Sequence, residues 1–265
     1  TQNIVTGTAG LLPLAGPANR QGRIAADNML GRTRHYQGSQ GTAICKVFSL
    51  HVSSTGQNEK QLAARKILAE KIYVHGASHA SYYPNATPIT LKLLFDPQAG
   101  QLLGAQVIGQ DGVDKRIDVL AVALRAGLTV TDLEHLELAY APPFNSARDI
   151  INQAGMLASN ILNGDTAICQ ASDVIHRDDA HQCLLDIRTA SELETLGQYP
   201  DALHIPLNEL RQNLHRLPHD KEILIGCQSG LRGHVAWCLL QAHGFRARNL
   251  TGGYKTWQAA SSLEK

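Results

Sequence analysis

The sequence has no long apolar run and almost no net charge, and both shortages exclude classes of protein. Lys and Arg total 24 against 23 Asp and Glu, which leaves a net charge of +1. This balance argues against a broad basic surface for nucleic acid or an anionic membrane. No apolar run approaches the roughly 18 residues of a transmembrane helix. The first ten residues also lack the basic and apolar parts of a signal peptide. We therefore expect neither a nucleic acid nor a membrane as a partner.

Cysteine is too scarce for a disulfide framework, because the 265 residues contain five cysteines and no C-x-x-C pair. We predict reduced thiols in a cytoplasmic protein. We interpret Cys45 as a core residue, since it lies in a strand-like run at 43–47. The chain begins with Thr1 rather than methionine, which predicts processing or a place within a longer polypeptide.

Several motifs of cofactor, metal and hydrolase chemistry are also absent from the sequence. It contains no G-x-G-x-x-G nucleotide fingerprint and no G-x-S-x-G motif of serine hydrolases. The 12 histidines include no H-E-x-x-H, and Gly76 interrupts the four-residue spacing between His75 and His79. We therefore predict no metal site.

Residues 1–163 mix helical and strand-like patterns, which predicts an α+β domain with an antiparallel sheet. The expected helices cover residues 17–31, 58–67, 113–127 and 146–162. The expected strands cover residues 42–52, 71–76, 87–95 and 102–109. The last two strands flank a turn-forming segment and should form a hairpin. Ser146 is predicted to cap the last helix.

Residues 164–265 alternate short apolar runs with helical stretches, after a turn-like segment at 163–166. The apolar runs lie at 183–187, 223–226 and 247–250. Strands that alternate with helices are typical of a parallel sheet. The pattern therefore predicts a second, α/β domain of ordinary size.

The strongest chemical signal is the segment ILIGCQSGLRG at 223–233. An apolar strand ends at Cys227, a loop with Gly230 follows, and Arg232 begins a helix that runs to about residue 242. Loop N–H groups and a helix N-terminus form an anion cradle. With Arg232 nearby, such a cradle favours a nucleophilic thiolate. The alternative is a small core cysteine beside an unrelated arginine.

Four segments of the second region, in order along the chain, resemble the rhodanese family. They are the D-x-R segment at 185–188, the segment at 202–206, the six-residue loop at 227–232, and the two-glycine segment at 250–254 followed by Trp257. Asp201 stands where the family usually has glycine. The resemblance covers the whole second region and implies a rhodanese-like sulfurtransferase domain.

The rhodanese resemblance implies that Cys227 attacks the outer sulfur of a sulfane donor and passes it, as a persulfide, to a thiol acceptor. Arg232 would stabilise the persulfide and the donor, while Asp186 and Arg188 would be structural supports. The loop N–H groups would hold the persulfide, at Gln228, Ser229, Gly230, Leu231 and Arg232. Gln228 stands where some thiosulfate-using relatives have a basic residue, which weakens the case for thiosulfate as the donor and leaves room for a larger persulfide.

Two other functions are compatible with this second region. One is a catalytically silent dimerisation or interaction module, against which the intact Cys227 and Arg232 count. The other is a rhodanese-fold phosphatase, whose loop is one residue longer and commonly has His where this chain has Gly226. We therefore rank sulfur transfer first.

The first region is similar to the C-terminal part of the flavin-dependent pyridine nucleotide-disulfide reductases. The segments 13–28, 78–84, 112–118 and 138–149 carry this resemblance. The most similar branch comprises the coenzyme A-disulfide and persulfide reductases that have a fused rhodanese domain. The two regions therefore resemble one fused family in the correct order.

This second resemblance implies roles for several residues of region 1–163. The helix at about 13–31 would point its N-terminus, at Ala15, Gly16 and Pro17, toward a flavin ring oxygen. The rest would be a dimerisation domain that forms a homodimer. Tyr82 or Tyr83, together with Tyr140, would face the partner's redox cysteine and bind the coenzyme A-linked substrate. Lys115 and Arg116 would be candidates for binding its phosphates. The alternatives are packing tyrosines and a solvated helix face.

The chain departs from that family by lacking both nucleotide fingerprints and the family's redox cysteine. We expect this chain alone to hold no cofactor tightly. FAD, NAD(P)H and coenzyme A would belong to the full-length enzyme, of which this chain would be the C-terminal portion.

Overall fold

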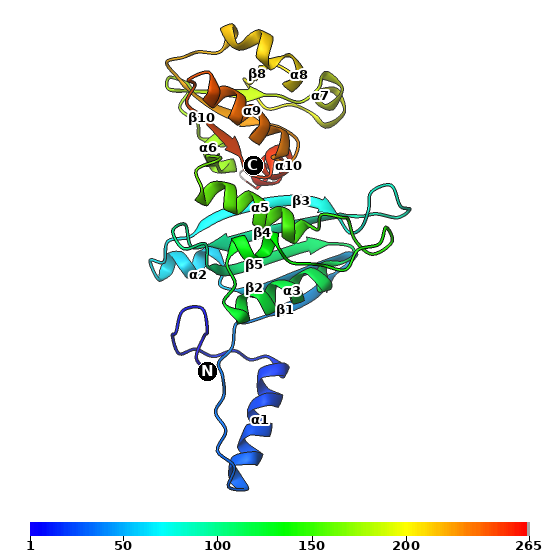
Figure 1. Ribbon diagram of the computed structural model, residues 1–265, viewed down its shortest axis with the longest axis vertical. Helices are drawn as coiled ribbons and strands as arrows, with labels where there is room; N and C mark the ends of the chain where they lie inside the picture. The colour runs from blue at the N-terminus through cyan, green and yellow to red at the C-terminus, as the bar shows by residue number, and fades with distance from the viewer. Residues whose placement is uncertain (264–265) are drawn as a thin grey trace. The chain divides into compact units, whose positions relative to one another are not determined.

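A five-stranded antiparallel sheet forms the centre of the first part of the chain in the computed structural model, which describes residues 1–263 (Figure 1). Its strands are β1 (Ala43–Val47), β2 (Leu50–Gly56), β3 (Glu70–Ala77), β4 (Pro88–Phe95) and β5 (Leu102–Gly109), in the order β1-β2-β5-β4-β3. The pairs β1–β2, β2–β5 and β4–β5 are antiparallel. The predicted antiparallel sheet and the hairpin of β4 and β5 are therefore confirmed.

The first part also contains helices. They are α1 (Ala15–Met29), α2 (Glu59–Ala64), α3 (Val113–Ala126), α4 (Val130–Glu134) and α5 (Ile150–Leu162). The α3 helix contacts β2 and β5 and buries Ile117, Leu120 and Leu124, at the helical spacing of its apolar face. It ends at Gly127, whose φ of 72° is the left-handed conformation that glycine adopts readily.

Three local predictions for the first part are wrong. The expected strand at 42–52 is a hairpin of β1 and β2, with Phe48 in the turn at a φ of 53°. The α5 helix begins at Ile150 rather than at Ser146, and the Asp149 carboxylate accepts the N–H of Ile151 at 2.9 Å. Cys45 is exposed rather than in the core, because β1 is an edge strand with every residue exposed.

The second part contains a five-stranded parallel sheet in the order β6-β10-β9-β7-β8. Its strands are β6 (Ile168–Cys169), β7 (Gln182–Asp186), β8 (Leu203–His204), β9 (Glu222–Gly226) and β10 (Ala247–Leu250). All four neighbouring pairs are parallel. The helices are α6 (Ala171–Ile175), α7 (Ala190–Leu196), α8 (Leu207–Leu210), the 3-10 helix η1 (Arg211–Arg216), α9 (Leu231–Ala242) and α10 (Gly253–Ser261). The predicted parallel sheet is confirmed.

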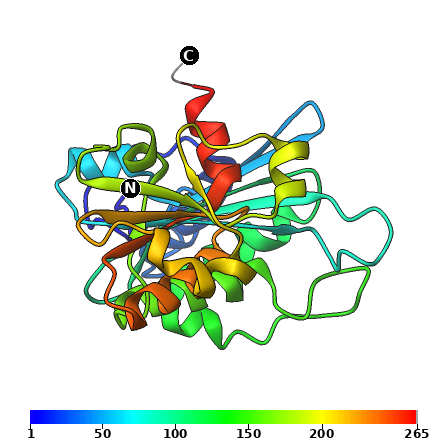
Figure 2. The ribbon, with the colours of Figure 1, turned by 90° about the horizontal axis from the view of Figure 1, so that it is seen from above.

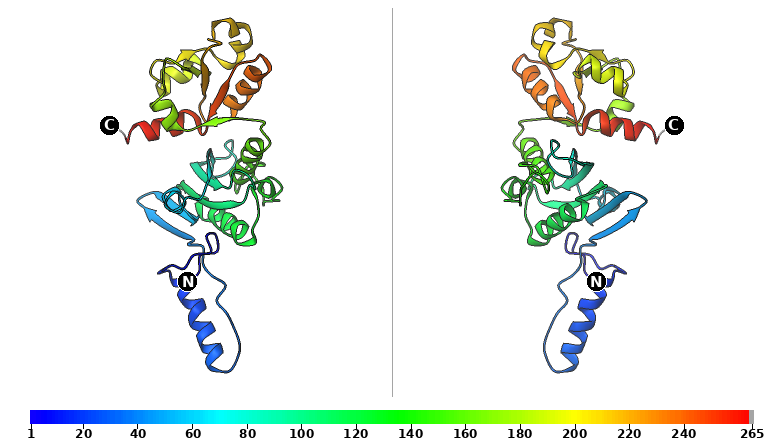
Figure 3. Two further views of the ribbon diagram at one scale, coloured as in Figure 1. Left: turned by 90° about the vertical axis from the view of Figure 1, so that its left-hand side faces the viewer. Right: turned by 90° about the vertical axis from the view of Figure 1, so that its right-hand side faces the viewer.

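Alternate residues of the parallel strands enter two separate apolar layers. Ile223 and Ile225 belong to the layer that includes Leu240 of α9, whereas Leu224 belongs to the layer that includes Tyr254 of α10. Figures 2 and 3 show α9 and α10 on opposite sides of this sheet. Burial on both faces explains why these strands read as continuous apolar runs in the sequence.

The chain divides into two units, one of residues 1–71 and 76–152 and the other of residues 72–75 and 153–265. Among residues 1–263, no helix combines the length and the apolar character needed to span a membrane.

Candidate active site

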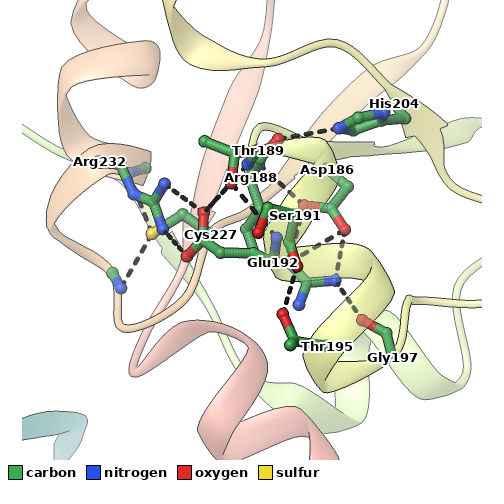
Figure 4. A network of polar contacts seen from close by, with 12 residues as sticks. Asp186, Arg188, Thr189, Ser191, Glu192, Thr195, Gly197, His204, Cys227 and Arg232 are labelled. Atoms are coloured by element: carbon green, nitrogen blue, oxygen red, sulfur yellow. Dashed lines mark hydrogen bonds and ion pairs between the residues drawn. The ribbon is translucent and has the colours of Figure 1, made fainter.

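Cys227 lies directly after β9, in the loop that leads into α9 (Figure 4). The strand is buried up to Gly226, and Cys227 itself is 1% exposed. A Cβ atom at Gly226 would lie 2.6 Å from the ring of Tyr199, which is closer than side chains normally approach. Glycine therefore lets the buried Tyr199 ring pack directly beneath the start of the loop.

Two backbone N–H groups donate to the Sγ atom of Cys227. They belong to Gly230, at an N···S distance of 3.0 Å, and to Gly233, at 3.3 Å. Gly230 turns the chain at a φ of 104°, and Gly233 lies in the first turn of α9, where N–H groups have no partner within the helix. Of the five predicted N–H donors, Gly230 is the one that donates to the sulfur here, and Gly233 is a donor that the sequence reasoning missed.

The turn between β10 and α10 holds the loop in this shape. The carbonyl oxygen of Cys227 accepts the N–H of Tyr254 at 2.7 Å. A Cβ at Gly253 would lie 2.3 Å from that same oxygen, so the second glycine of the predicted segment permits a close backbone approach. Asn249, at the end of β10, donates its side-chain amide to the carbonyl of Gly230 at 3.0 Å.

Arg232 forms a two-pronged ion pair with Glu192, while the sulfur of Cys227 receives the backbone N–H groups (Figure 4). One guanidinium nitrogen donates to a Glu192 oxygen at 2.7 Å, and the second nitrogen donates to the other oxygen. The Arg232 hydrogen bond is the main cause that lowers the pKa of Glu192 to about 2. Glu192 in turn raises the pKa of Arg232.

Glu192 is the site residue that sequence reasoning missed. It is the third residue of α7 and forms a capping box with Thr189, whose N–H and hydroxyl both donate to the Glu192 carboxylate. The T-x-x-E pattern at 189–192 is a recognisable signal for a helix start. It does not show that the carboxylate also pairs with Arg232, which is 40 residues away along the chain.

Asp186 and Arg188 lie buried at the end of β7, at 1% and 0% exposure. The Asp186 carboxylate accepts hydrogen bonds from two nitrogens of the Arg188 guanidinium, at N···O distances of 2.7–3.1 Å. The guanidinium also donates to the carbonyl of Gly197 and lies 3.9 Å from the ring centroid of Tyr254. Since Tyr254 also holds the carbonyl of Cys227, the pair occupies a supporting position behind the loop.

The other predicted loop residues differ in exposure. Gln228 and Ser229 are half-buried, and Leu231 is 61% exposed. The carbonyl of Gln228 accepts the N–H of Lys255 at 3.3 Å. The loop therefore presents its apolar Leu231 side chain to solvent next to the buried sulfur.

In the first unit, the hydroxyls of Tyr82 and Tyr140 lie 2.9 Å apart. Both side chains are well exposed, and the hydrogen bond to Tyr140 raises the pKa of Tyr82. Tyr83 instead packs edge-on against the ring of His79 at a centroid distance of 5.8 Å. The structure therefore brings together Tyr82 and Tyr140 and leaves Tyr83 in a packing contact.

Lys115 and Arg116 lie in very different environments although they are adjacent. Arg116 is 1% exposed, and its guanidinium donates to Asp149 and Asn145 and to the carbonyls of Ser78 and Gly112. The alternative of a solvated helix face is therefore wrong for Arg116. Lys115 is half-buried, donates to the carbonyl of Ala139, and has a pKa lowered mainly by burial. Of the two predicted phosphate contacts, Lys115 is the one at the surface.

Ala15, Gly16 and Pro17 form the first turn of α1, as predicted. Leu14 precedes them and gives no side-chain cap to the helix, and all four residues line a cavity of about 1020 Å³. A Cβ at Gly16 would meet only the end of the Arg20 side chain, at 3.8 Å. An uncapped helix start beside an open cavity can offer backbone N–H groups to a ligand atom with negative charge.

Comparisons with known proteins assign both parts of the chain. Residues 42–150 match the pyridine nucleotide-disulphide oxidoreductase dimerisation domain, and residues 170–260 match the rhodanese-like domain. The chain therefore contains a pyridine nucleotide-disulphide oxidoreductase dimerisation domain followed by a rhodanese-like domain. The predicted resemblance of both regions, and their order, is confirmed.

Three similar reductases are longer than this chain. A coenzyme A disulfide reductase from Staphylococcus aureus (strain bovine RF122 / ET3-1) is 37% identical over 148 residues, which are 56% of this chain and 33% of the relative. The structure of reduced Bacillus anthracis CoADR-RHD has a TM-score of 0.95 and 45% identity, over 99% of this chain and 47% of that one. A NAD-dependent persulfide reductase from A. fulgidus has a TM-score of 0.87 and 34% identity, over 97% and 46%. The chain thus spans a third to a half of their lengths.

Proposed function

We propose that Cys227 of the rhodanese-like domain carries sulfur as a persulfide and transfers it to a thiol. The observation that supports this most is the pair of N–H groups, from Gly230 and Gly233, that donate to the Cys227 sulfur at the start of α9. Backbone N–H groups at a helix N-terminus suit a sulfur that bears negative charge before and after transfer.

The transfer consists of two balanced displacements at sulfur. The thiolate of Cys227 attacks the outer sulfur of a donor R–S–SH, a new S–S bond forms, and the donor's S–S bond breaks with its electron pair leaving on RS⁻. An acceptor thiolate then attacks the outer sulfur of the Cys227 persulfide and restores the Cys227 thiolate. The Gly230 and Gly233 N–H groups hold the inner sulfur throughout, so the loop needs no rearrangement between the two steps.

We further propose that the dimerisation domain forms a homodimer within a longer coenzyme A-disulfide or persulfide reductase. The similarity to a coenzyme A disulfide reductase and a persulfide reductase, and the contact between Tyr82 and Tyr140, support this assignment. Tyr82 and Tyr140 would orient the coenzyme A-linked sulfur at the partner subunit, and Lys115 would take a phosphate. FAD, when bound to the longer enzyme, would pass electrons from NAD(P)H to that sulfur substrate. The N–H groups at the start of α1, beside Gly16, would face its ring.

Intact-mass measurement tests the sulfurtransferase proposal. The protein is incubated with glutathione persulfide or coenzyme A persulfide, and we expect a gain of one sulfur atom that an added thiol removes. Cys227→Ser should abolish this gain, whereas Cys238→Ser, which changes an exposed cysteine on α9, should retain it. An equal gain in the Cys227→Ser protein, or no gain in the parent protein, would refute the proposal.

A further inference from the structure

The ion pair between Arg232 and Glu192 lies at the edge of the Cys227 loop and is partly open to solvent. The two side chains are 34% and 24% exposed. Both terminal nitrogens of the Arg232 fork already donate to the two Glu192 oxygens. This fork has the shape that binds a carboxylate or another oxyanion in a two-pronged manner.

Glu192 is held firmly in this position from its own side. Its carboxylate also accepts the N–H of Thr189 at 3.0 Å and the Thr189 hydroxyl at 3.1 Å, as part of the helix cap. An oxyanion that used the Arg232 fork would therefore have to displace a fixed carboxylate, and would meet its negative charge at close range. The carboxylate remains ionised at neutral pH because its pKa is about 2.

We propose that Glu192 determines the donor class of Cys227 by occupying the Arg232 fork, so that the site prefers organic persulfides to small dianionic donors such as thiosulfate. This inference deepens the proposed sulfur transfer and rests on it. An organic persulfide carries one negative charge at most on its reacting sulfurs, and its attached group does not need the fork. Thiosulfate is a compact ion with two negative charges. It cannot bind the Arg232 guanidinium while Glu192 occupies it.

Both donors would use the same displacement at Cys227. With thiosulfate, the thiolate bonds to the outer sulfur, the S–S bond breaks, and the electron pair leaves on sulfite. With glutathione persulfide, the electron pair leaves on the glutathione thiolate. Since the attacking thiolate is shared, a substitution that changes the two rate constants by different factors reports recognition of the donor rather than the reactivity of the cysteine.

The test measures the second-order rate constant of sulfur gain at Cys227 by quenched intact mass, with thiosulfate and with glutathione persulfide. Glu192→Gln removes the charge but keeps the capping-box pattern, since Gln also serves at this position. We expect its thiosulfate rate constant to rise about tenfold and its persulfide rate constant to change less than about threefold. Glu194→Gln, the same charge change at an exposed position of α7, should leave both rate constants nearly unchanged.

The outcomes separate this inference from the proposed function. The parent protein first has to gain sulfur. If Glu192→Gln then changes the rate constants of both donors equally, changes neither, or lowers the thiosulfate rate constant, Glu192 does not set the donor class. A rise for thiosulfate that Glu194→Gln reproduces would assign the effect to overall charge and would equally overturn the inference. Absence of sulfur gain with both donors in the parent protein would refute the proposed function, and this inference with it.

Discussion

Replacing Arg188 by methionine should strongly destabilise the rhodanese-like domain. The Arg188 guanidinium is 0% exposed, binds the Asp186 carboxylate through two nitrogens, and stacks on the Tyr254 ring. Methionine retains the apolar stem but leaves the carboxylate of Asp186, 1% exposed, without its cation. Breaking a buried pair on one side typically costs about 3–5 kcal/mol, because an uncompensated charge remains in the interior.

The measurement uses the two tryptophans of the chain, Trp237 and Trp257, which both lie in this domain. Their fluorescence during guanidinium titration therefore reports the unfolding of this domain. Arg246→Ala, at an exposed arginine of the same domain, serves as the control and should cost less than about 0.5 kcal/mol. A double variant, Asp186→Leu with Arg188→Met, should recover part of the loss, since no lone charge is left buried. A loss below about 1 kcal/mol for Arg188→Met, or strict additivity in the double variant, would refute the reasoning.

Three further predictions concern the same domain. The pKa of Glu192 is about 2 in the folded protein and higher in the unfolded chain. Its ion pair should therefore stabilise the fold above pH ~4.5 and lose that contribution as the pH falls toward 2. The free energies of unfolding of the parent protein and of Glu192→Gln, measured against pH, should converge near pH ~2. Burial raises the pKa of Cys169 to about 12, so peptide mapping after brief alkylation at pH 8 should show Cys45 modified and Cys169 intact. Gly226→Ala should lower the rate of sulfur gain and the midpoint of unfolding, because its methyl group overlaps the Tyr199 ring; unchanged values for both would contradict this.

Much of the fold was predictable because its local signals agree with its packing. The β9 strand reads as an apolar run since its residues enter two apolar layers. The α3 helix has apolar residues at helical spacing and Gly127 at its end, so both signals predict the same element. Failures occurred where a neighbour in space decides the outcome. Cys45 has the sequence context of a core residue, but β1 is at the sheet edge, and strand order is not encoded within a five-residue run.

The candidate site shows the same division. The positions of Cys227 and Gly230 follow from one continuous segment, and the structure places the Gly230 N–H on the Cys227 sulfur. The partner of Arg232 does not follow from that segment, because Glu192 comes from α7 and meets it only through the order of β7 and β9 in the sheet. The T-x-x-E pattern at 189–192 is typical of a helix start, but a cap residue with a second contact has the same sequence signature.

The burial of three arginines indicates which positive charge is open to a ligand. Arg116 and Arg188 are 1% and 0% exposed, and each is paired with a buried aspartate, so both charges are used to hold loops in place. Arg232 is 34% exposed, and its partner carboxylate is also at the surface. A ligand can reach an ion pair that is partly open to solvent, whereas it cannot reach the two buried pairs. Of these three cations, Arg232 is therefore the one that a ligand at Cys227 could contact, and Glu192 is the group with which a donor that needs the Arg232 fork has to compete.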